Sequence, residues 1–133
     1  MERLLERLAT AKRAMVTLEE LMSLDHPSQI EKDASLQRFE YTFEAVWKAA
    51  KQFLFEFEGL DEGSLKSVIR ACHRVGIFDK EQTILALRMT DDRNLTVHTY
   101  NEPLSLAIYE RIKGHAPLLR HWLELMESTD DQP

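Results

Sequence analysis

The chain has 133 residues, 44% of them hydrophobic and 30% charged, which fits one soluble domain with a single core. With only 4 glycines and 4 prolines, it has few turn signals, so we expect a small number of long helices. The formal net charge of −6 argues against coating nucleic acid through a broad positive surface, but leaves room for a local basic pocket. No apolar run is long enough to predict a membrane span.

The first residues are charged and amphipathic, and they lack the apolar segment of a signal peptide. Cys72 is the single cysteine and has no partner for an internal disulfide. Both features predict a protein of the reducing cytoplasm.

Two long helices are expected in the first half of the chain. The first has apolar residues spaced four and three apart, and it stops before His26 and Pro27 because proline disfavours helix at the preceding residue. The second runs from Gln29 to Glu58 with the same spacing and an aromatic-rich apolar face. The apolar stripes are Leu4, Leu8, Ala11, Met15, Leu18 and Met22 in the first, and Leu36, Phe39, Phe43, Val46, Ala50, Phe53 and Phe57 in the second.

Three further helices are expected in the second half. Ser64 caps a short one that Gly76 closes, and Asp79 with Gln82 predicts a capping arrangement for a fourth that runs toward Asp92. The last begins near Asn101, with a proline in its first turn, and Gly114 and Pro117 are expected to bend it. Its apolar stripe is Ile108, Ile112, His115, Leu119, Trp122 and Met126.

These elements predict an all-α protein, an up-and-down antiparallel four-helix-type bundle with about five helices and no sheet. We expect residues 1–133 to form one domain, and its tail, residues 128–133, to be frayed.

A chemically suggestive motif follows the fourth helix. Arg93, His98 and Tyr100 have the spacing Arg-x4-His-x-Tyr. A guanidinium suits a phosphate, and an imidazole exchanges protons near neutral pH, so the motif is equipped for metal-free cleavage of a phosphodiester. The ordinary alternative is that Arg93 pairs with Asp91 or Asp92 while His98 forms a local hydrogen bond.

Other polar residues have two interpretations. Glu40, Glu44 and Lys48 are each four residues apart and form either a solvated ladder of charges or one side of a polar groove. Cys72 and His73 are adjacent and face different sides of a helix, so we expect no metal site, and we place Cys72 in the core.

Two segments together resemble one family. The segment from Asp33 to Lys48 is similar to the second-helix signature of the HEPN domain family, and the segment from Asp92 to Glu102 is similar to the Arg-x4-His-x-Tyr motif of its HepT, or nucleotidyltransferase substrate-binding, branch. The resemblance extends over most of the chain.

The resemblance implies a homodimer that cleaves RNA, such as tRNA or mRNA, without a metal or cofactor. Arg93 and His98 would be the catalytic pair, with Asn94 and Asp92 in support. It also implies a partner, an MntA-type minimal nucleotidyltransferase, that silences this RNase toxin by transferring AMP to Tyr100.

Two other functions remain open from the sequence. One is a non-catalytic subunit that presents a substrate to the nucleotidyltransferase. The other is a plain helical interaction module in which the motif is incidental. Toxicity on expression alone separates the first hypothesis, the RNase toxin, from the substrate-presenting subunit.

Overall fold

The computed structural model describes residues 2–98 and 100–130, and this part of the chain contains helices and no strand. The all-α class expected from the sequence is confirmed. None of its helices is long and apolar enough to cross a membrane. The elements in chain order are α1 (Glu2–Met22), α2 (Gln29–Glu58), α3 (Leu65–Arg74), α4 (Lys80–Leu95), a 3-10 turn η1 (Thr96–His98) and α5 (Glu102–Asp130).

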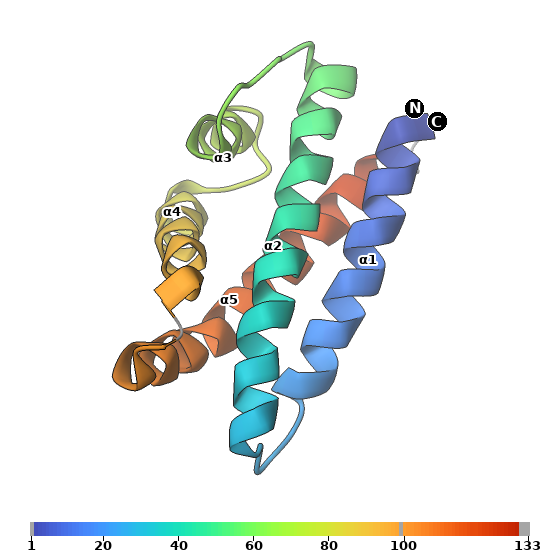
Figure 1. Cartoon of the computed structure of the whole chain (residues 1–133). Coiled ribbons are helices and arrows are strands. Elements are labelled where there is room, and N and C mark those ends of the chain that lie inside the picture. The colour runs from blue at the N-terminus through green and yellow to red at the C-terminus, as the bar shows by residue number, and fades with distance from the viewer. Residues whose placement is uncertain (1, 99, 131–133) are drawn as a thin grey trace.

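The three long helices build the main core. α1 and α2 run antiparallel as a hairpin, and α5 crosses behind both of them (Figure 1). The apolar stripes of these helices face one another, because residues three and four apart share one side of a helix. The largest side chains fully buried between the three helices include Leu4, Met15, Leu18, Phe39, Phe43, Ile108, Ile112 and Trp122.

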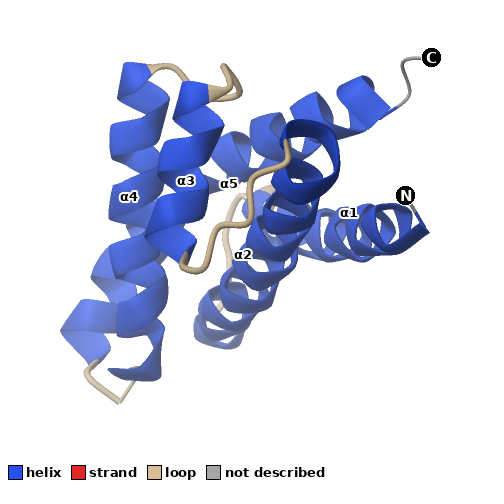
Figure 2. Cartoon of the chain, turned by 90° about the horizontal axis from the view of Figure 1, so that it is seen from above, coloured by secondary structure: helices blue, strands red, loops and turns tan. Residues whose placement is uncertain are grey.

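The two shorter helices form a second layer. α3 and α4 pack against each other and lie on the side of α2 away from α1 (Figures 1 and 2). Phe78, in the link between them, is buried with its ring 5.0 Å from that of Trp122, so the link is anchored to α5. The end of α4 and the motif that follows it are thereby held between α2 and α5.

Local sequence signals fix the helix boundaries. Ser28, Ser64 and Asp79 each accept a hydrogen bond from the backbone three residues on, and the side chain at that third position accepts one from the cap backbone in return. Gly59 and Gly76 take left-handed φ angles of 67° and 86° where α2 and α3 end. The caps predicted at Ser64 and Asp79 are confirmed.

A few boundaries differ from those expected. α5 continues through Asp130, so residues 128–130 are helical, and residues 131–133 lie outside the described part of the chain. Phe57, placed on the core stripe of α2, is 39% exposed and stacks on Phe53, because it lies in the last turn. Pro117 is accommodated inside α5.

Candidate functional site

The motif spans the junction between α4 and the 3-10 turn. Asp92, Arg93 and Asn94 lie in the last turn of α4, His98 ends η1, and Tyr100 follows in a turn. The Thr96 hydroxyl lies 2.7 Å from the Arg93 carbonyl and 3.2 Å from Glu40 Oε2, and both oxygens accept from it. This residue therefore fastens η1 both to α4 and to α2.

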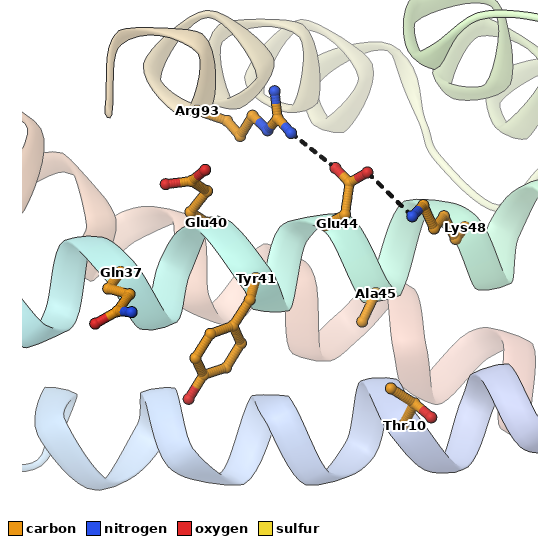
Figure 3. A pocket seen from close by; sticks show the side chains of 8 residues that line it. All are labelled: Thr10, Gln37, Glu40, Tyr41, Glu44, Ala45, Lys48 and Arg93. Carbon is orange, nitrogen blue, oxygen red and sulfur yellow. Dashed lines mark hydrogen bonds and ion pairs between the residues drawn. The ribbon is translucent and has the colours of Figure 1, made fainter. Parts of the chain in front are cut away.

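Arg93 reaches across to α2. Its Nη2 donates to Glu44 Oε2 at 2.9 Å (Figure 3). The same Glu44 oxygen accepts from Trp47 Nε1 at 2.9 Å, and the other oxygen lies 3.4 Å from Lys48 Nζ. The ordinary alternative, in which Arg93 pairs with Asp91 or Asp92, is not what the structure shows, because the end of α4 turns Arg93 toward Glu44 of α2.

Burial and charge act in opposite directions on Glu44. Burial raises its pKa, but the Trp47 hydrogen bond and the charges of Arg93 and Lys48 outweigh this effect, so the pKa is lowered from 4.5. The carboxylate is therefore ionised at neutral pH, where it neutralises part of the Arg93 charge.

Glu40, Glu44 and Lys48 line a hollow of about 500 Å³ together with Arg93. Figure 3 shows Glu40 and Glu44 on the side of α2 toward Arg93, with the Tyr41 ring on the side toward α1. The structure thus places these three residues of α2 along a groove, and the solvated-ladder interpretation describes only the Glu44–Lys48 pair.

His98 and Tyr100 form an exposed pair. The Tyr100 hydroxyl lies 3.2 Å from His98 Nδ1, and the two rings meet edge to face with their centroids 5.7 Å apart. Tyr100 is 83% exposed. Among the described residues, no hydrogen bond joins Arg93 to His98, so a substrate group would have to connect the two.

Asp92 has a different environment from its neighbour. It is 5% exposed and accepts from Arg111 Nε at 2.8 Å, from Arg111 Nη2 at 2.7 Å, and lies 2.7 Å from His115 Nε2. Burial raises its pKa, but the bonds and charges of Arg111 and His115 more than offset this, and the pKa is lowered from 3.8. Asp92 therefore ties α4 to α5 and does not face the groove.

The sequence interpretation missed Arg111 and treated His115 as part of the apolar stripe. The two lie one helical turn apart on α5, a spacing that lets both reach one carboxylate. That spacing indicates that the two side chains can bind one carboxylate, but it does not identify the carboxylate as Asp92.

The other candidates are structural. Cys72 is buried in the core, as expected. Within residues 2–98 and 100–130, no three His, Cys, Asp or Glu side chains gather closely enough to hold a metal ion.

The sequence from residue 6 to residue 128 matches the family model described as nucleotidyltransferase substrate binding protein like. The chain belongs to this family. The match reaches from α1 into the last turns of α5, so the resemblance drawn from the two motifs is confirmed. No curated protein matches the chain.

Solved structures agree with this assignment. A crystal structure of a Thermus thermophilus protein is 52% identical, with a TM-score of 0.84, covering 87% of this chain and 98% of that one. A Haemophilus influenzae protein described as having the fold of a substrate-binding domain of a nucleotidyltransferase is 22% identical, with a TM-score of 0.77, covering 90% and 98%.

A third structure is the tri-AMPylated Shewanella oneidensis HEPN toxin in complex with MNT antitoxin. It is 16% identical, with a TM-score of 0.73, covering 94% of this chain and 96% of that one. At such identities the last two likenesses establish a shared fold.

Proposed function

We propose that this family member is a metal-independent RNase toxin, active as a homodimer and controlled by a minimal nucleotidyltransferase. The observation that carries the proposal is the position of His98. Its exposed imidazole sits on η1, directly beyond the turn of α4 that bears Arg93. A phosphate bound to Arg93 would then have a proton-exchanging group nearby.

The proposed cleavage needs one base and one acid and can proceed without a metal ion. One base takes the proton from the ribose 2′-hydroxyl, whose oxygen attacks the adjacent phosphorus, and one acid protonates the departing 5′-oxygen. His98 is assigned to one of these proton transfers, and Arg93 to stabilising the negative charge that develops on phosphorus oxygens. In a homodimer, two motifs would supply the second imidazole and offset the acidic net charge.

Tyr100 is the proposed point of control. Its hydroxyl is within hydrogen-bonding distance of His98 and its ring is open to a partner enzyme. Transfer of AMP from ATP to this hydroxyl, with release of pyrophosphate, would place a bulky anion beside His98, where it would repel the substrate phosphate and crowd the imidazole.

A second function is favoured by one contact. Because Nη2 of Arg93 is already occupied by Glu44, its charge is partly neutralised. This arrangement suits a subunit that presents a substrate to the nucleotidyltransferase without cutting RNA, as the family description suggests.

Expression without the partner separates the two. Wild type, His98→Ala and the control His26→Ala, which changes an exposed loop histidine, are induced while growth and total RNA are followed. We expect wild type and His26→Ala to arrest growth and yield cut RNA, and His98→Ala to do neither while keeping the same helical circular dichroism. Intact RNA and normal growth in all three would favour the substrate-binding subunit.

A further inference from the structure

Arg93 makes fewer hydrogen bonds to its carboxylate partner than Arg111 and Arg120 make to theirs. Arg111 uses Nε and Nη2 to grip both oxygens of Asp92, and Arg120 uses the same two nitrogens to grip both oxygens of Glu19. Arg93 places Nη2 on one oxygen of Glu44, and its Nη1 makes only a long contact of 3.4 Å with Asn94 Oδ1. Its Nε is buried, and no described group accepts a hydrogen bond from it.

Glu44 does not bind the guanidinium of Arg93 through both of its oxygens. The oxygen that accepts from Arg93 is shared with Trp47, and the other oxygen faces Lys48. A phosphate has more acceptor oxygens than a carboxylate and fits a two-bond guanidinium fork. Replacement of Glu44 by a phosphate would therefore add a bond that the protein itself does not supply.

The Arg93–Glu44 pair also separates two hollows. On one side lies the hollow of about 500 Å³ that contains Lys48 and Tyr41. On the other lies a hollow of about 430 Å³ that contains Lys66, Trp47 and Asn94. Arg93 and Glu44 line both, so the pair forms the barrier between them.

We propose that these two hollows are one binding track for single-stranded RNA, closed in the free protein by Glu44, which occupies the place of an RNA phosphate. This proposal rests on the RNase function proposed above and assigns its substrate path. When Glu44 swings away from Arg93, a continuous groove crosses α2 between α1 and the α3–α4 pair.

The groove has the two components that a single strand needs. Lys48, Arg93 and Lys66 supply positive charge along its length, beside the carboxylates of Glu40 and Glu44 and, at Lys66, of Asp91. Tyr41 and Trp47 supply partly exposed aromatic rings, one on each side of the barrier. Cations that follow the backbone together with rings that stack on bases are the usual means of holding single-stranded RNA. Glu44 opposes binding through its negative charge and its hydrogen bond to Arg93. A ligand must therefore carry several phosphates to displace it.

The test measures binding of a labelled oligouridylate, about eight nucleotides long to match the site size of single-strand binders, by fluorescence anisotropy. All proteins carry His98→Ala so that the probe is not cut. Glu44→Gln keeps the shape of the side chain and removes its charge, and we expect it to tighten binding roughly three- to tenfold. The matched control is Glu110→Gln, which removes the same charge from an exposed pair with Lys113 and should change affinity less than about twofold.

A second pair of variants tests the far side of the barrier. Lys66→Met should weaken binding and reduce the slope of log affinity against log salt by about 0.7, the value for one phosphate contact on a single strand. Lys113→Met, on another face, should leave the slope unchanged. This pair keeps the proposal testable if Glu44→Gln folds poorly.

Three outcomes would overturn the track. In the first, Glu44→Gln changes the affinity for the oligonucleotide no more than Glu110→Gln does. In the second, Lys66→Met changes the affinity and the salt slope no more than Lys113→Met does. In the third, AMP binds as tightly as the oligonucleotide, which would indicate a mononucleotide site. These failures are distinct from failure of the nuclease. If wild type cuts RNA while Glu44→Gln has no effect on binding, the track falls and the nuclease stands. If wild type cuts nothing while Glu44→Gln still tightens RNA binding, the nuclease falls and the track stands.

Discussion

Asp92 and Arg93 are adjacent in the chain, yet their side chains bind different helices. Asp92 is held by Arg111 and His115 of α5, and Arg93 reaches Glu44 of α2. Consecutive residues on an α-helix point about 100° apart, so the last turn of α4 can be fastened on two sides at once. The position of Arg93 in the groove thus depends on its buried neighbour.

Asp92→Asn should destabilise the protein by about 1–3 kcal/mol, because it leaves the buried His115 and the half-exposed Arg111 without their anionic partner. Urea denaturation at neutral pH measures this change. Asp91→Asn is the matched control, since Asp91 is exposed and pairs with Lys66 on the surface. That control should change stability by less than about 0.5 kcal/mol, and equal losses in the two variants would contradict the role given to Asp92.

Stability should also depend on acid pH through Asp92. Its folded pKa lies below the ordinary 3.8, so its contribution is complete above that value and is lost as the pH falls through the folded pKa. The free energy of unfolding should therefore fall as the pH drops below about 4, and less steeply in Asp92→Asn. Parallel slopes for the variant and the wild type would assign the acid sensitivity to other carboxylates, among them Glu44.

Cys72 should be chemically silent in the folded protein. Burial raises the pKa of its thiol to about 12, so almost no thiolate forms near neutral pH. Iodoacetamide at about pH 8 should label the protein in guanidinium and leave the native protein unlabelled by mass spectrometry. Rapid labelling of the native protein would mean that the core around α3 opens readily.

Co-expression with the proposed nucleotidyltransferase partner should add AMP to Tyr100 and relieve growth arrest. Tyr100→Phe should remain unmodified, while Tyr41→Phe, which alters another partly exposed tyrosine bonded to Thr17, should still be modified. Intact-mass and peptide mass spectrometry locate the group. AMP on a different residue would remove Tyr100 from the control mechanism.

The helices were predictable because their signals are local. The boundaries at Ser64, Asp79 and Gly76 depend on residues within a few positions, and the apolar stripes depend on a spacing that can be counted. The 3-10 turn at Thr96–His98 was not predicted, since its hold on Glu40 of α2 is a contact between distant segments.

The contacts of the site were less predictable for the same reason. Periodicity tells which side of a helix a residue occupies, and it does not tell which helix it will meet. Arg93 finds Glu44 at a separation of 49 residues, and Asp92 finds Arg111 at 19. Both partners were visible as charged residues, but only the packing of α4 between α2 and α5 decides the pairs.

The two layers of helices should differ in the free energy needed to open them locally. The three long helices supply most of the core, and α3 and α4 complete it from one side as a hairpin that the motif follows. Segments with fewer buried contacts open at lower free energy than the centre of a fold. Amide hydrogens of α3 and α4 should therefore exchange with deuterium sooner than those in the middle of α2. Because Arg93 belongs to α4 and Glu44 to α2, an opening of this hairpin would separate the two side chains.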